Sequence, residues 1–232
     1  MPVNRRSVLK GLGALAAAPL LGPPALAQGV GRVPVDLQLV LAVDASASVN
    51  KDLLDFQLRG HAAAFRHPAV ARAIQDGPRR RIAVMLAQFA GPDTLATLVP
   101  WRELAGEADC QDFAATVDGL PGIAMGGSTA LGSAVVGAVQ LLEAAPFATH
   151  KRKIDLVSNG FSNAGIDPAT ARGYAAAAGV TVNALAILDE YPWLESYYAD
   201  SIIGGEGAFV RSADSAESFA ESFLQKLVTE IA

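Results

Sequence analysis

Short apolar runs, separated by segments with helical spacing, dominate the chain after its first 35 residues. Four runs are nearly continuous in apolar side chains: residues 36–44, 81–90, 154–158 and 180–188. Such runs are typical of strands that are covered on both faces. Between them, apolar residues recur three or four positions apart, which indicates helices. Strands that alternate with helices predict an α/β fold with a doubly wound, mostly parallel, Rossmann-like sheet.

Two weaker strands are predicted at the margins of this sheet. The turn at Gly91-Pro92 lets residues 94–100 return as an antiparallel edge strand. Pro100 is expected to end that strand, because proline has no N–H to donate to a ladder. Residues 207–211 are predicted to form a last short strand before a final amphipathic helix.

Three loops carry polar side chains or glycines at positions where chemistry is expected. They are residues 44–48 after the first strand, residues 126–129 before a helix, and residues 158–160 after a later strand. In a doubly wound sheet, ligands bind outside the carboxyl ends of the parallel strands. We therefore expect the three loops to lie on one rim of the sheet.

The first of these loops offers three hard oxygen donors. Asp44, Ser46 and Ser48 stand at alternate positions, so an extended backbone places their side chains on one side. No His or Cys lies near them in the sequence. Carboxylate and hydroxyl oxygens suit Mg²⁺, Ca²⁺ or Mn²⁺ and suit zinc poorly.

Residues 1–27 are predicted to be an export signal. Arg5 and Arg6 form a twin-arginine motif, a Gly/Ala/Leu segment follows, and Ala25-Leu26-Ala27 provides a cleavage site. The apolar stretch has 17 residues and is broken by three prolines, so it is shorter than the roughly 20 residues of a spanning helix. We expect a periplasmic or secreted domain, residues 28–232, with no stable membrane insertion after signal cleavage.

The charge of the mature chain argues against a nucleic-acid partner. Removal of the signal would leave 15 Lys and Arg residues against 23 Asp and Glu residues, a net charge of −8. The one dense basic run, residues 150–153, is interpreted as a solvated loop. The single cysteine, Cys110, cannot form an intrachain disulfide and is interpreted as a packing residue.

The order of the motifs argues against the enzyme classes that the chain superficially suggests. Residues 160–164 nearly match the Gly-x-Ser-x-Gly turn of hydrolases, but all three histidines precede Ser162, whereas that triad needs one after its serine. Residues 45–50 contain no glycine that would admit a dinucleotide pyrophosphate. No His or Cys pair has the spacing of a catalytic transition-metal site. A non-enzymatic role is therefore expected.

The three loops together resemble the metal-ion-dependent adhesion site of von Willebrand factor type A domains. The motif is Asp-x-Ser-x-Ser at residues 44–48, a glycine-flanked Thr129 and a third loop after the next strand. More narrowly, the mature chain resembles an exported bacterial family of this fold, catalogued as domain of unknown function 1194. That resemblance is carried by residues 43–49, 144–147, 154–155 and 202–210. It implies four ligands of a divalent cation, direct or through water: Asp44, Ser46, Ser48 and Thr129.

The third loop departs from the pattern of the family. An aspartate usually precedes its glycine, and here Asn159 takes that place. An amide oxygen can still bind a cation or its water, so Asn159 is included as a fifth ligand, but one negative charge is lost. The cation, Mg²⁺ or else Mn²⁺ or Ca²⁺, is therefore expected to be weakly held. The resemblance implies that an acidic side chain of a protein partner completes its coordination.

Asp155 does not replace the missing aspartate in this prediction. About 13 Å of extended strand separates it from Asn159, and it is predicted to be a buried or edge carboxylate within hydrogen-bonding distance of a neighbour. Two other interpretations of the rim stay open. Residues 44–48 could form a helix-capping turn without metal, or the domain could be a periplasmic binding module for a small anionic ligand, with residues 189–193, Tyr197 and Tyr198 as an aromatic wall.

Overall fold

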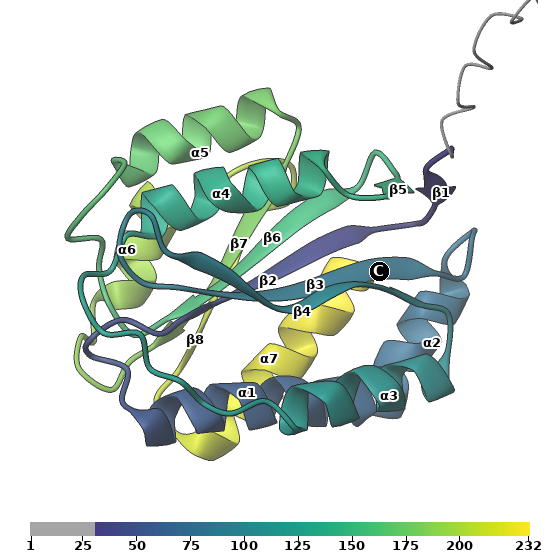
Figure 1. Ribbon diagram of the computed structural model, residues 1–232, viewed down its shortest axis with the longest axis horizontal. Helices are drawn as coiled ribbons and strands as arrows, with labels where there is room; N and C mark the ends of the chain where they lie inside the picture. Colours follow the sequence, from purple (N-terminus) through teal and green to yellow (C-terminus); the bar gives the residue numbers. More distant parts are fainter. Residues whose placement is uncertain (1–30) are drawn as a thin grey trace, which may run out of the picture. The chain divides into compact units, whose positions relative to one another are not determined.

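The computed structural model describes residues 31–232, and the export signal predicted for residues 1–27 lies outside them. A six-stranded sheet with the order β4-β3-β2-β6-β7-β8 forms its centre (Figure 1). β3 and β4 are antiparallel, whereas the other neighbouring strands are parallel. β1 and β5 form a separate parallel pair. The strands are β1 Val33–Pro34, β2 Gln38–Asp44, β3 Ile82–Phe89, β4 Leu95–Leu104, β5 Phe147–Ala148, β6 Arg152–Ser158, β7 Thr181–Ile187 and β8 Val210–Ala213.

Helices cover both faces of the central sheet. Figure 1 shows α4 and α5 over one face and α1, α3 and α7 over the other. The helices are α1 Lys51–Arg66, α2 Pro68–Asp76, α3 Glu107–Asp118, α4 Leu131–Glu143, α5 Pro168–Ala177, α6 Leu194–Ser201 and α7 Ala216–Ile231. The predicted fold class is thereby confirmed: an α/β fold whose doubly wound sheet is mostly parallel and has one antiparallel edge strand.

The alternation of side chains along β2 explains why the sheet needs both layers. Leu39, Leu41 and Val43 pack into the core that the sheet shares with α1, α3 and α7. Val40 and Ala42 pack into the second core, which contains side chains of α4, α5 and α6. All five are fully buried. Because both faces of the strand are covered, its residues 39–43 are continuously apolar instead of alternating with polar residues.

The prediction that Pro100 ends the edge strand is wrong. β4 continues to Leu104, and its pairing with β3 shifts register between Val84 and Leu86. Val84 is opposite Arg102, and Leu86 is opposite Val99, so Pro100 lies in the irregular stretch between these pairs. At such a bulge in an edge strand the missing N–H of proline removes no regular ladder bond.

Two further differences from the predicted elements lie near the C-terminal part of the sheet. The last strand begins at Val210, three residues later than predicted, because Gly205 and Gly207 have φ values of +99° and +65° and turn the chain first. Residues 194–201 form the helix α6, which was not predicted; only Tyr197 and Tyr198 within it were expected to lie in the aromatic wall.

Three charged side chains lie fully buried between α7 and the sheet, and we call them the buried charge cluster. Lys226 Nζ lies 2.7 Å from Asp155 Oδ1 and 2.5 Å from Glu230 Oε1. Asn183 Nδ2 also donates to Glu230 Oε1 at 2.8 Å. The prediction that Asp155 is a buried carboxylate beside a partner is confirmed. Burial, together with the charge of Asp155, raises the pKa of Glu230 to about 7.

Replacing Gly132 by alanine is expected to destabilise the domain by about 1–3 kcal/mol, since its added Cβ would lie 2.1 Å from the carbonyl oxygen of Ile166. This close approach packs the start of α4 against the loop before α5. Gly173→Ala is the matched control, because Gly173 is exposed within α5 and no atom lies within 4 Å of an added Cβ. Higher helix propensity should stabilise that variant by up to about 1 kcal/mol. Urea unfolding measures both, and equal effects would contradict the close approach.

Candidate metal centre

Loop one, residues 44–48, begins where β2 ends. Asp44 is the last residue of that strand and is fully buried. Its Oδ1 accepts a hydrogen bond of 2.7 Å from the backbone N–H of Ser46. Ser46 is fully buried as well, whereas Ser48 is exposed. Loop one therefore holds its carboxylate inside the protein and presents one hydroxyl at the surface.

Loop two, which we define as residues 126–129, is attached to loop one through the backbone. The N–H groups of Met125 and Gly126 donate to the carbonyl oxygen of Ala45 at 2.9 and 3.1 Å. Gly126 has a φ of +71° and its neighbour a φ of +81°, values that favour glycine. These contacts bring Thr129 against loop one, and its Oγ1 donates to Ser46 Oγ at 2.9 Å.

Loop three, residues 158–160, closes the group from the side of β6. Ser158 Oγ donates to Asp44 Oδ2 at 2.5 Å. Ser48 Oγ donates to Asn159 Oδ1 at 2.9 Å, so the amide oxygen of the asparagine faces loop one. Asn159 Nδ2 in turn donates to Asp189 Oδ2 at 3.2 Å. The amide is thus held between a hydroxyl and a carboxylate.

The structure brings all five sequence-predicted residues onto one rim of the sheet. They are Asp44, Ser46, Ser48, Thr129 and Asn159. Only Asp44 among them has an ionisable side chain. Burial raises its pKa, and hydrogen bonds from Ser158 and Ser46 partly offset that increase. A nearby cation would favour the ionised form of this carboxyl group.

The chemistry of the donor set fits a hard divalent cation. Among residues 31–232, no three His, Cys, Asp or Glu side chains gather as metal ligands usually do. The rim instead combines one carboxylate with hydroxyl and amide oxygens, which suit Mg²⁺, Mn²⁺ or Ca²⁺. Asp44, Ser46, Ser48, Thr129 and Asn159 are the residues that would hold such a cation, and the cation would supply a positive charge able to bind an anion.

Sequence reasoning missed several residues that position these donors. Ser158 is placed beside Asp44 because β2 and β6 pair in parallel with Val43 opposite Val157, a register that the sequence does not state. Tyr198, in the helix that was not predicted, donates from its hydroxyl to the carbonyl oxygen of Gly160 at 2.7 Å. The segment after β7 was expected on this rim, and Asp189 lies there.

Solved structures define the class of fold. Proximal thread matrix protein 1 (PTMP1) from the mussel byssus is 18% identical over 86% of this chain and 49% of its own, with a TM-score of 0.60. Another structure of PTMP1 has zinc in its metal-ion-dependent adhesion site (MIDAS) motif. The pilus adhesin SpaC from Lactobacillus rhamnosus GG is 15% identical over 85% of this chain and 30% of its own, with a TM-score of 0.60. A von Willebrand factor type A protein from Catenulispora acidiphila is 14% identical over 85% of this chain and 43% of its own, with a TM-score of 0.57.

This chain therefore spans about half or less of the length of each of these proteins. At such identities the likeness concerns the fold alone, and that fold is the von Willebrand factor type A fold. The sequence then gives the family. The family described as "Protein of unknown function (DUF1194)" matches residues 34–232, and the chain belongs to it.

A twin-arginine translocation signal matches residues 2–22, so the chain is exported by the twin-arginine route. No curated protein matches the chain in sequence. Within residues 31–232, no helix combines the length and the hydropathy that crossing a bilayer requires.

Proposed function

We propose that this exported domain binds a divalent cation at the candidate metal centre and uses it to recognise an acidic protein partner. The five ligands are those predicted: Asp44, Ser46, Ser48, Thr129 and Asn159. The observation that carries the proposal is the convergence of three separate loops on one set of oxygen donors, joined by hydrogen bonds of 2.5–2.9 Å. The cation is Mg²⁺, with Mn²⁺ or Ca²⁺ as substitutes, and the domain acts in the periplasm or outside the cell.

A shortage of negative charge supports the role of the partner. One carboxylate among five donors leaves a divalent cation with a net positive charge, so the site holds it weakly and can accept a carboxylate from another protein. Ser48 is the exposed member of the set and marks the side from which that carboxylate would approach. The MIDAS motif of PTMP1 and the adhesive role named for SpaC are consistent with this mechanism.

An aromatic cluster beside loop three supports recognition of a protein. Phe161, Tyr191 and Trp193 pack together with ring centroids 5.3–5.7 Å apart, and Trp193 also contacts Tyr197. Trp193 is 48% exposed and Phe161 is 36% exposed. Aromatic side chains often contribute most of the binding energy at protein interfaces, so exposed aromatic rings that pack together beside a charged site are typical of such an interface.

Capture of partners from a periplasmic extract tests the proposal. The immobilised exported protein should retain a protein in the presence of Mg²⁺ and release it when EDTA removes the metal. Calorimetry with Mg²⁺ and Mn²⁺ alone should show binding to the free domain. Heats with simple dicarboxylates and no captured protein would instead favour the small-anion binding module, and the absence of any metal binding would favour a metal-free capping turn.

Replacing Asn159 by aspartate is expected to tighten metal binding about tenfold, since it restores the missing anion to the third loop. In EDTA the same change should lower the melting temperature, because the new carboxylate loses its donor contact with Asp189 and faces its charge. Calorimetry and thermal unfolding with and without Mg²⁺ measure both effects.

Asn50→Asp is the matched control for this experiment. Asn50 caps α1 because its side-chain oxygen accepts a hydrogen bond from the N–H of Leu53, and aspartate caps helices equally well. The control therefore adds one negative charge two residues beyond loop one without adding a ligand. A gain in affinity that is equal in both variants would show that the general field, and not residue 159, is responsible.

A further inference from the structure

A second polar concavity lies at the opposite end of the central strands from the candidate metal centre. Gln38 begins β2 and Arg152 begins β6, and both line it, whereas Asp44 and Ser158 end the same strands at the other rim. Its volume is about 890 Å³, a size that is usual for small-molecule sites. A smaller cavity of about 560 Å³ shares residues 150–152 with it. We name the larger cavity the basal pocket.

Positive charge dominates the lining of the basal pocket. Four of its side chains carry a Lys or Arg charge: Arg32, Arg79, Lys151 and Arg152. Asp36 is the one acidic side chain in the lining among residues 31–232. The whole chain has a net charge of −5, so the sign of the pocket is opposite to that of the protein. A concave surface lined by one sign of charge concentrates ligands of the other sign.

Asp36 is already engaged by groups of the protein. Its carboxylate accepts hydrogen bonds of 2.9 and 3.0 Å from the backbone N–H of Arg79 and lies 3.6 Å from the guanidinium of the same residue. Thr149 Oγ1 donates to the carbonyl oxygen of Asp36 at 3.1 Å. Asp36 thus anchors both loops that carry the basic side chains, the Arg79 loop through its carboxylate and the Thr149 loop through its backbone carbonyl, and the charge of the carboxylate is compensated locally.

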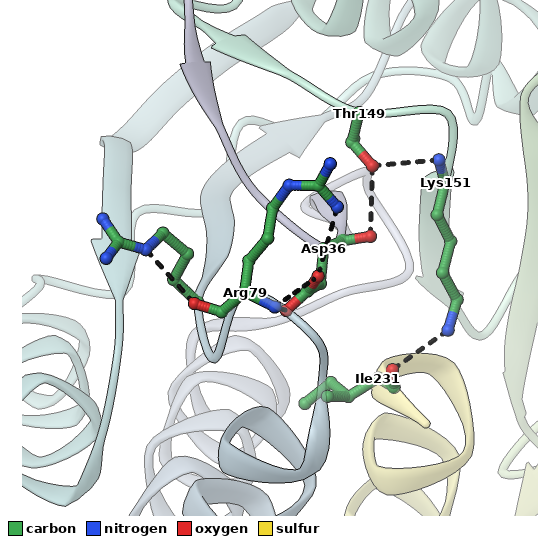
Figure 2. Close-up of polar contacts among 6 residues, drawn as sticks. Asp36, Arg79, Thr149, Lys151 and Ile231 are labelled. Carbon is green, nitrogen blue, oxygen red and sulfur yellow. Dashed lines mark hydrogen bonds and ion pairs between the residues drawn. The ribbon is translucent and has the colours of Figure 1, made fainter.

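Two of the basic side chains keep donors for a ligand. Figure 2 shows Arg79 and Lys151 on opposite sides of Asp36. Lys151 Nζ donates to the carbonyl oxygen of Ile231 at 3.0 Å, which uses one of its three N–H groups, and the guanidinium of Arg79 has five. Burial lowers the pKa of Lys151 because it disfavours the charged ammonium group. An anion bound beside Lys151 would favour the charged form and would be attracted by it.

Gln38 adds a buried oxygen that needs a hydrogen-bond donor. It is 2% exposed, and its Nε2 donates to the carbonyl oxygen of Phe147 at 2.8 Å. Its Oε1 is buried and has no hydrogen-bond partner in the described part of the chain. A buried acceptor without a donor costs about 1–3 kcal/mol. Gln38 lines the pocket, and a ligand O–H group that reached this oxygen would remove that cost.

We propose that the basal pocket binds an organic phosphate that carries hydroxyl groups, either as a free molecule or as the headgroup of an anionic phospholipid. The planar donors of arginine match phosphate oxygens in pairs, and lysine adds a point charge. Phosphate then accounts for the basic lining, and the hydroxyl group would supply a donor for the unpaired oxygen of Gln38. This site is independent of the candidate metal centre and of its partner.

Calorimetry of the exported protein with sn-glycerol 3-phosphate, inorganic phosphate and glycerol tests the proposal. Glycerol 3-phosphate should bind at least fivefold more tightly than inorganic phosphate, and glycerol should not bind. Arg79→Gln should weaken the binding of glycerol 3-phosphate at least tenfold and keep the fold, because only the backbone of Arg79 makes the 2.9 and 3.0 Å contacts with Asp36. EDTA should leave this binding unchanged.

Lys51→Gln is the matched control, since it removes one positive charge from a side chain that is 68% exposed at the start of α1, outside the lining of the basal pocket. Sedimentation with phosphatidylglycerol vesicles, against phosphatidylcholine vesicles, distinguishes the two sources. Vesicle binding that Arg79→Gln abolishes, without binding of soluble glycerol 3-phosphate, identifies a lipid headgroup, and the reverse identifies a free phosphate. No binding to either probe, or equal losses in Arg79→Gln and Lys51→Gln, would overturn the proposal.

Discussion

Replacing Asp44 by alanine is expected to abolish binding of Mg²⁺ and Mn²⁺ while the domain still folds. Asp44 is the only carboxylate of the five proposed ligands, and without it four neutral oxygen donors remain. Neutral donors alone do not compensate the loss of hydration of a small divalent cation. Calorimetry should therefore show no metal binding at concentrations at which the unmodified protein is saturated, and the circular dichroism spectrum should be unchanged.

The stability of a second variant at this position, Asp44→Asn, provides a further measurement. Burial raises the pKa of Asp44, which means that its ionised form is disfavoured in the folded protein without a cation. A group with a raised pKa supports folding at low pH and loses that contribution as the pH rises. In EDTA, Asp44→Asn should consequently unfold at the same or a higher urea concentration than the unmodified protein at pH 8.

Asp189→Asn is the control that separates a ligand from a nearby charge. Asp189 is exposed and accepts one hydrogen bond from Asn159, so its loss removes the same charge from the same rim. Metal affinity should fall by no more than a few-fold in this variant. If Asp44→Ala bound metal as tightly as the unmodified protein, the assignment of all five ligands would be wrong.

Replacing Lys226 by methionine is expected to lower the free energy of unfolding by about 3–5 kcal/mol at pH 8. Lys226 is fully buried and is the positive member of the buried charge cluster, with Asp155 at 2.7 Å and Glu230 at 2.5 Å. Its removal leaves two buried carboxyl groups that repel each other. Urea unfolding monitored by circular dichroism measures the loss.

The pH dependence of this loss follows from the same physics. In Lys226→Met the buried Glu230, whose pKa is raised, binds its proton more tightly in the folded protein than in the unfolded chain, so the stability of the variant increases as the pH falls. The difference from the unmodified protein should therefore be smaller at pH 5 than at pH 8. Combining Lys226→Met with Asp155→Asn and Glu230→Gln should recover most of the stability. A loss that is independent of pH and is not recovered would indicate packing, not charge, as the cause.

Much of the fold could be predicted from the sequence because burial determines the pattern of apolar residues. Residues 39–43 are apolar throughout since β2 has a core on each of its faces. The predicted element boundaries were wrong where tertiary contacts, and not the local sequence, determine the secondary structure. A bulge lets β4 pass Pro100, and α6 has only eight residues, so that its apolar spacing is too short to stand out.

The candidate metal centre could be predicted in outline because its residues follow strand ends, and parallel strands present these ends on one rim. The residues that position it were harder to find. Asp189 lies 30 positions from Asn159 in the sequence, and nothing local links them. The basic run at residues 150–153 was interpreted as a solvated loop, since its sequence does not reveal that Lys151 reaches the end of α7 and lines a cavity.

The length of β2 has a consequence for how the two rims influence each other. From Gln38 to Asp44 the strand rises about 20 Å, whereas the screening length in 0.15 M salt is about 8 Å. At physiological ionic strength, an acidic molecule near the candidate metal centre is therefore not influenced by the charge of the basal pocket, and the reverse also holds. In dilute buffer the screening is weaker, and the basal pocket would attract the same carboxylates that the metal is proposed to bind. Ionic strength therefore decides which of the two sites an acidic molecule reaches first.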